Sequence, residues 1–174
     1  PPIHISIASP DSASAKLAGS KCWGVISGPV APRYAVANHW QAYSEARHAA
    51  GKRARSEDWR VSRLILVAPT DAEAEERTYG ERASNRYYCS YMRTALATAN
   101  RLAMIKPRPD MADDECTADV IMNECVIHGS PRTVLDKLVA LRERVGPFGT
   151  LLQIGLDWGG RNEAWERDGM RLLV

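Results

Sequence analysis

The sequence VSRLILVAPTDAE, residues 61–73, places a nearly continuous apolar run directly before a helix start. The run from Val61 to Ala68 is typical of a parallel strand that is buried on both faces, because half-exposed strands alternate with polar residues instead. Thr70, followed three positions later by Glu73, is the capping-box pattern with which many helices begin. The segment therefore predicts one strand–helix unit of an α/β protein.

The same order of strand and helix repeats on both sides of this segment. Apolar runs predict further strands at residues 3–8, 23–27 and 150–155, and apolar periodicity predicts helices at 11–18, 33–50, 86–104, 131–145 and 162–174. Ser9 is expected to cap the first helix, with Pro10 at its first position. Alternation of this kind indicates parallel βαβ units, but four strands are only half of the eight in a β/α barrel.

A segment without a clear period separates the helix at 86–104 from the one at 131–145. Lys106-Pro107-Arg108-Pro109 breaks the preceding helix, and acidic residues are frequent after it. We expect residues 105–124 to form a long, mobile loop of the kind that often serves as a lid. Lys106 and Arg108 either meet an anionic group or are solvated loop charges, and the charge pattern alone favours solvation.

Composition and charge exclude several classes of protein. The chain has 174 residues, of which 45% are hydrophobic, with a formal net charge of +2, so neither nucleic-acid binding nor a membrane span of about 18 apolar residues is expected. The four cysteines form no C-x-x-C pair, which argues against a metal or redox site and favours free thiols in the cytoplasm. The chain begins at Pro1-Pro2-Ile3 without methionine, which suggests a fragment, a processed product or a trimmed chain.

The serine-rich start of the first helix is the best candidate site that the residues alone indicate. Ser9, Ser12 and Ser14 surround a helix N-terminus, where free N–H groups and the helix dipole favour an anion. The alternative is that Ser9 or Asp11 merely caps the helix, and the charge of Asp11 also opposes an anion. No serine or cysteine lies in a recognisable pattern with a histidine and an acid, so the catalytic residues stay unknown.

Several motifs together resemble one family. Residues 5–13 (ISIASPDSA), 17–19 (LAG) and 23–27 (WGVIS) are similar to the fifth and sixth βα segments of bacterial luciferase-like monooxygenases. Residues 128–134 (HGSPRTV) resemble the helix start before that family's eighth strand, and residues 146–155 resemble the turn and strand that follow. Cys22 is a departure, since relatives commonly carry glycine there.

The resemblance implies that residues 1–174 are the C-terminal half, strands five to eight, of a (β/α)8 TIM barrel. It also implies that the cofactor is reduced FMN, which a separate flavin reductase supplies, and that the reaction is the oxygenation of a small organic substrate with O2. Ser9, Ser12 and Ser14 would contact the flavin phosphate, Ser27 would lie near the flavin, and residues 105–124 would be the lid.

Two alternatives accompany this interpretation. The same barrel also carries F420-dependent oxidoreductases. The chain could instead be an inert half-barrel that associates with an N-terminal half-barrel or with itself as a homo-oligomer, because the family's active-site histidine and arginine positions lie mostly in the half that this sequence lacks. The isolated chain is therefore expected to be inactive.

Overall fold

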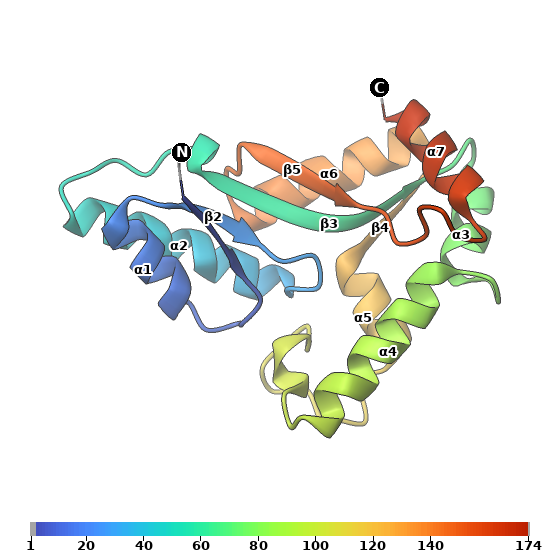
Figure 1. Ribbon diagram of the computed structural model, residues 1–174, viewed down its shortest axis with the longest axis horizontal. Helices are drawn as coiled ribbons and strands as arrows, with labels where there is room; N and C mark the ends of the chain where they lie inside the picture. Colours follow the sequence, from blue (N-terminus) through green and yellow to red (C-terminus); the bar gives the residue numbers. More distant parts are fainter. Residues whose placement is uncertain (1–2, 174) are drawn as a thin grey trace.

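The computed structural model describes residues 3–173 as a parallel sheet with helices between its strands (Figure 1). The strands are β1 (His4–Ile7), β2 (Gly24–Ser27), β3 (Trp59–Val67), β4 (Val126–Gly129) and β5 (Thr150–Ile154). The helices are α1 (Ala13–Lys21), α2 (Arg33–Ala49), α3 (Asp71–Tyr79), α4 (Ser84–Thr98), α5 (Ala118–Cys125), α6 (Pro131–Val145) and α7 (Glu163–Leu172). Short 3-10 turns lie at Ser56–Asp58 and Leu102–Met104. The predicted α/β class is confirmed.

Strand β3 is the centre of the sheet. Val61 pairs with both β2 and β5, whereas Leu64 pairs with both β4 and β5. Because a strand has only two hydrogen-bonding edges, β2 and β4 must follow one another along the same edge of β3 (Figure 1). All the pairings are parallel, and among residues 3–173 the strands β1 and β5 each pair with a single neighbour.

The prediction of four strands was wrong by one, because it missed β4. This strand has only four residues, and it begins immediately after α5 without a glycine or proline between them. A run so short carries no period, and its pairing with Leu64–Val67 of β3 connects residues far apart in the sequence. Its place in the sheet is therefore a long-range property.

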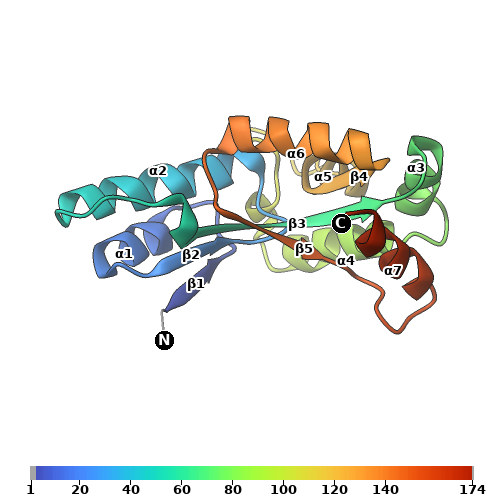
Figure 2. The same ribbon diagram turned by 90° about the horizontal axis from the view of Figure 1, so that it is seen from above.

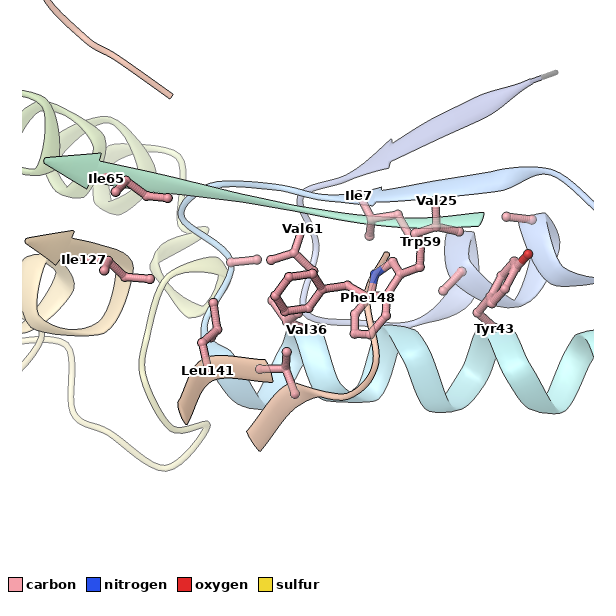
Figure 3. Close-up of a cluster of buried hydrophobic side chains, with 14 of the residues drawn as sticks. Ile7, Val25, Val36, Tyr43, Trp59, Val61, Ile65, Ile127, Leu141 and Phe148 are labelled. Carbon is pink, nitrogen blue, oxygen red and sulfur yellow. The ribbon is translucent and has the colours of Figure 1, made fainter. Parts of the chain in front are cut away.

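The main core lies between β3 and the helices α2 and α6, which follow one another on the same side of the sheet (Figure 2). Trp59 is its largest fully buried side chain (Figure 3). The Trp59 ring stacks on Trp40 of α2 at 5.0 Å between centroids and meets Phe148 edge-on at 6.1 Å. These aromatic contacts hold α2, and the turn before β5, against β3.

A second core lies on the opposite face of β3, where Leu64 packs with residues of α4 and α5. Here the expectation that residues 105–124 form a loop was wrong in part, because residues from Ala118 onward form α5. Thr117 caps that helix through a hydrogen bond from the Val120 N–H. The remaining loop is anchored in the core by the buried side chains of Ile105, Met111 and Cys116.

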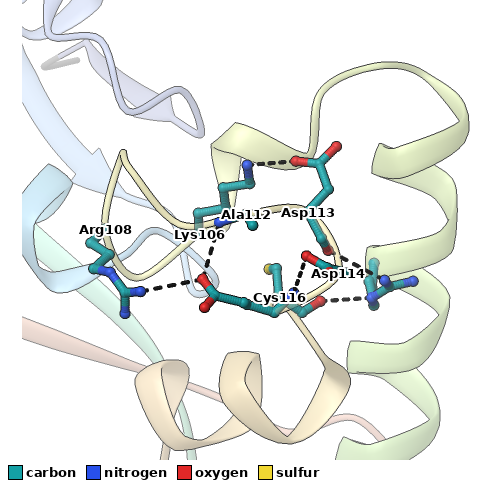
Figure 4. Close-up of polar contacts among 8 residues, drawn as sticks. Lys106, Arg108, Ala112, Asp113, Asp114 and Cys116 are labelled. Atoms are coloured by element: carbon teal, nitrogen blue, oxygen red, sulfur yellow. Dashed lines mark hydrogen bonds and ion pairs between the residues drawn. The ribbon is translucent and has the colours of Figure 1, made fainter.

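Polar contacts restrain the same loop from within (Figure 4). Lys106 pairs with Asp113 at 2.5 Å, and Arg108 pairs with Glu115 at 3.3 Å. Arg93 of α4 donates to the Cys116 carbonyl oxygen at 2.6 Å. Lys106 and Arg108 thus form ion pairs with acids of their own loop, and a role of this segment as a lid stays a prediction.

The first helix begins later than expected. Its N-cap is Ser12, not Ser9, and Pro10 lies outside it; the helix runs on to Lys21 rather than ending near Gly19. Cys22 then adopts a left-handed conformation with φ of +59°. Glycine adopts this conformation without strain, which explains why a glycine suits the position.

Candidate functional site

The carboxyl ends of β1 and β2 place the predicted site residues at one edge of the sheet. Ile7 and Ser27 are paired across the two strands, and the Gly28 N–H donates to the Ile7 carbonyl oxygen at 3.0 Å. The segment from Ser9 to the start of α1 therefore lies beside the turn that follows β2. In parallel α/β proteins, ligands bind at this end of the strands.

Asp11 occupies the start of α1 in this structure. Its carboxylate accepts a hydrogen bond from the Ser9 hydroxyl at 2.5 Å and another from the Ala13 N–H at 3.0 Å. These two bonds, the one from Ser9 first, lower the pKa of Asp11. The contacts show that this helix start accepts a negative charge, and that its own aspartate supplies one.

Ser12 and Ser14 complete the serine-rich group. Ser12 is the N-cap residue, but its hydroxyl makes no capping hydrogen bond. Ser14 is exposed in the first turn of α1, where backbone N–H groups lack partners within the helix. The structure thus brings Ser9, Ser12 and Ser14 together around one helix N-terminus, and a contact of these residues with a cofactor stays a prediction.

Ser27 is placed differently from the other three serines. It is fully buried, its hydroxyl lies 3.1 Å from Nδ1 of His39, and it accepts a hydrogen bond from Nε1 of Trp59 at 3.0 Å. Its side chain therefore lies on the face of the sheet that α2 covers. The position of Ser27 near a flavin stays a prediction. Its hydroxyl already forms hydrogen bonds with His39 and Trp59.

His39 connects Ser27 with the serine-rich segment, and the sequence did not reveal this. Its Nε2 lies 2.9 Å from the Ser9 carbonyl oxygen, which can only accept, so Nε2 carries the proton and Nδ1 accepts from Ser27. Burial is the main reason that the pKa of His39 is lowered. The signal was present in part, because His39 falls between Val36 and Tyr43 on the buried face of α2.

The segment after β5 forms a turn. Asp157 accepts hydrogen bonds from the Ser84 hydroxyl and from the Asn162 N–H, both at 2.9 Å, and Gly159 has φ of +76°. These bonds join α4 to the start of α7.

Within residues 3–173, no helix combines the length and the apolar character that crossing a membrane requires.

Comparisons with known proteins agree with this architecture. Residues 1–147 match the sequence profile of luciferase-like monooxygenases. Over 154 residues the chain is 30% identical to 3,6-diketocamphane 1,6-monooxygenase of Pseudomonas putida, which corresponds to 87% of this chain and 39% of that protein.

Solved structures give the same result at the level of the fold. The oxygenating constituent of 3,6-diketocamphane monooxygenase from Pseudomonas putida, a type II Baeyer-Villiger monooxygenase in complex with FMN, is 25% identical, with a TM-score of 0.82 over 99% of this chain and 47% of that one. A monooxygenase, RslO1, from Streptomyces bottropensis has a TM-score of 0.64 at 24% identity over 99% of this chain and 46% of its own. An F420-dependent secondary alcohol dehydrogenase shares the fold at 17% identity and a TM-score of 0.54, over 99% of this chain and 49% of its own.

This chain spans less than half the length of these relatives. The family profile nevertheless covers most of it. The chain belongs to the luciferase-like monooxygenase family.

Proposed function

We propose that this chain is the C-terminal half of a TIM barrel, strands five to eight, and the FMN-phosphate-binding part of a flavin-dependent monooxygenase. The flavin would arrive reduced from a separate reductase, and with O2 it would supply the chemistry that oxygenates a small organic substrate. The protein's part is to bind and orient the flavin and to keep water out. An N-terminal half-barrel would complete the site.

The start of α1 is the observation that carries this proposal. Asp11 shows that its donors hold a carboxylate, and a phosphate has the same need for N–H and O–H donors. Ser12 and Ser14 add hydroxyls at the same helix end. For a phosphate to bind, the Asp11 carboxylate must turn aside, since two anions cannot share these donors. The FMN contained in the Pseudomonas relative supports the same cofactor class.

A titration that compares FMN with riboflavin tests this proposal, because the two ligands differ only in the phosphate. We expect FMN to bind more tightly than riboflavin, measured by quenching of flavin fluorescence. Ser14→Ala should weaken FMN binding by about tenfold, since a hydrogen bond to a charged group contributes about 1.5–3 kcal/mol. It should leave riboflavin unchanged.

Asp11 supplies the sharper test. Asp11→Asn should strengthen FMN binding, because it removes a negative charge from the start of α1, and riboflavin should again respond little. Ser20→Ala, at the other end of the same helix, is the matched control, since the Ser20 hydroxyl bonds only to the Leu17 carbonyl oxygen. Equal affinity for FMN and riboflavin in all variants would contradict the proposal.

Two alternatives have distinct outcomes in the same titration. Quenching by F420 in place of FMN would favour a deazaflavin-dependent oxidoreductase, and one F420-dependent dehydrogenase shares the fold. An inert half-barrel would bind neither flavin, either alone or with an N-terminal half added. The unpaired edges of β1 and β5 among the described residues are the observation that favours this second candidate.

A further inference from the structure

A second place in the structure carries an excess of positive charge, away from the serine-rich helix start. It is a cleft of about 300 Å³ between α6, α5, β4 and the start of α2. Its charged or titratable lining residues are Arg33, Arg63, Tyr79, Glu124, His128, Lys137 and Arg144. None of the four predicted site serines lines it. A volume of this size lies at the lower end of the range for small-molecule sites, about 300–1,000 Å³.

Arg63 is the deepest charge in the cleft wall. It lies in the middle of β3, beyond the last residue of β2 and before the first residue paired with β4, and its exposed fraction is 1%. Its Nη1 donates to the carbonyl oxygens of Ser62, Gly28 and Pro29, at 3.1, 3.3 and 3.4 Å. Its Nε and Nη2 have no hydrogen-bond partner among the described residues.

An arginine in this state is a strong reason to expect an anion. The guanidinium group stays charged in proteins and offers five donors in a planar fork, which suits the oxygens of a phosphate or a carboxylate. Burial is the main reason that the pKa of Arg63 is lowered, and the charges of the nearby Glu124 and Arg33 act on it in opposite directions. Nε and Nη2 of this buried guanidinium lack acceptors, and the oxygens of a bound oxyanion would supply them.

Glu124, the acid that lines the cleft, compensates only part of the charge of Arg63, because its carboxylate bonds directly to Arg33. Glu124 pairs with Arg33 at 3.4 Å, and its other oxygen accepts a hydrogen bond from the Arg33 N–H at 2.6 Å. Lys137 donates to the His128 carbonyl oxygen at 2.8 Å, which is a neutral acceptor. Arg144 is exposed and forms no ion pair within residues 3–173. Arg63, Lys137 and Arg144 therefore contribute three positive charges that form no ion pair with an acid within the described residues.

We propose that this cleft binds a small phosphate-bearing anion, with Arg63 at its base and Lys137 and Arg144 of α6 at its mouth. The site is separate from the one proposed for the FMN phosphate. Free phosphate and the phosphate group of a small metabolite share the chemistry that these residues recognise. The cleft exceeds the needs of a bare phosphate, so a phosphate monoester of a small polar molecule fits it best.

Calorimetric titration with inorganic phosphate and with glucose 6-phosphate, with glucose as the neutral control, tests this site. Both anions should bind, the ester more tightly, and glucose should not bind. Lys137→Gln and Arg144→Gln should each weaken the binding by about tenfold, because a charge-assisted contact to phosphate is lost. If glucose 6-phosphate bound no more tightly than inorganic phosphate, the site would be assigned to the free phosphate ion.

Arg142→Gln is the matched control, since Arg142 is an exposed arginine on the same helix that does not line the cleft. This control separates binding at a specific site from the general effect of phosphate salts on proteins. If Arg142→Gln weakened binding as much as Arg144→Gln, or if the unaltered chain gave no heat with either anion, the proposal would be wrong. Arg63→Met provides a second check, because it should abolish binding while circular dichroism reports whether the chain is folded.

The FMN titration keeps the two proposed sites apart. Lys137→Gln and Arg144→Gln should leave the quenching by FMN unchanged, whereas Ser14→Ala should weaken FMN binding and leave the binding of glucose 6-phosphate intact. Loss of both ligands in one of these variants would show that the chain has one anion site rather than two, and would overturn this inference without deciding the cofactor.

Discussion

At the scale of single residues, His39 combines burial, a fixed tautomer and contacts with two segments of the candidate site. It joins α2 to the Ser9 carbonyl oxygen and to the Ser27 hydroxyl, and Trp59 binds the same hydroxyl. A neutral imidazole satisfies every group in this chain of hydrogen bonds. A protonated one would present two donors and lose the bond that it accepts from Ser27.

The stability of the protein should therefore depend on pH near the ordinary histidine range. Burial lowers the pKa of His39 below 6.5, and the pKa of His128 is lowered too, so the unfolded chain takes up protons first as the pH falls. The contribution of these two imidazoles to the free energy of unfolding should be constant well above pH 6.5 and should decrease below it. Urea titrations across this range measure the effect.

His39→Gln should flatten this pH profile in part. His48→Gln, on an exposed position of the same helix, should leave the profile as it is. A His39→Gln profile that follows the unaltered chain would show that the imidazole does not titrate with unfolding.

Cys22 offers a prediction about backbone strain. It is one of two residues other than glycine with positive φ within residues 3–173, and the other is Asn100. A side chain in the left-handed region costs about 1–2 kcal/mol, but asparagine tolerates it better than cysteine does. Cys22→Gly should raise the free energy of unfolding by up to about 1 kcal/mol.

Asn100→Gly is the matched control and should change stability less. Chemical unfolding of the two variants under reducing conditions measures the difference. Equal effects at the two positions would mean that the cysteine is not strained.

The site residues that could be predicted are those that lie close together in the sequence. Ser9, Ser12 and Ser14 follow one strand and surround one helix start, so local pattern was enough to group them. The hydrogen bonds from His39 to Ser9, and the position of Arg63 beside the turn at Gly28, join segments about thirty residues apart. No local pattern carries such information, and these two residues were missed as parts of a site.

At the scale of elements, the helices with strong signals at both ends were predicted best. Ser130 caps α6 by accepting from the Thr133 N–H, and Pro131 opens the helix, as the sequence indicated. The start of α1 was predicted wrongly because Ser9-Pro10 is the same serine–proline pattern as Ser130-Pro131. The Ser9 hydroxyl, however, bonds to Asp11 and does not cap the helix. β4 and α5 were missed because each is short and is stabilised by tertiary contacts with β3 and α4.

The two serine N-caps provide a direct test of this difference. Ser130→Ala should lower the free energy of unfolding by about 1 kcal/mol, because it leaves a backbone N–H of α6 without its partner. Ser12→Ala should have a much smaller effect, since the Ser12 hydroxyl makes no capping bond. Thermal unfolding followed by circular dichroism compares the two, and the reverse order of effects would contradict the assigned caps.

At the scale of the whole molecule, the sheet has one face covered by helices and a second face that is covered only in part. Val61 and its partner Leu151 point toward the main core, so the neighbouring pair, Ser62 and Leu152, points to the opposite face. Leu152 of β5 and Ile26 of β2 are both half-buried and belong to neither core. Apolar residues on a parallel strand are normally covered, which fits a sheet that needs a further part.

The proposed half-barrel makes a prediction about association that follows from this face. We expect the isolated chain to sediment as a species larger than a monomer. The edges of β1 and β5 that have no partner strand among residues 3–173, and the apolar residues beside them, favour contact with other strands. Leu152→Lys should shift the chain toward monomer, since a lysine on the open face opposes such contact. Leu135→Lys is the matched control, because Leu135 is 54% exposed on α6, away from the sheet edges. Dissociation by Leu135→Lys instead would place the contact on the outer helices, and a folded monomer in the unaltered chain would argue against an open half-barrel.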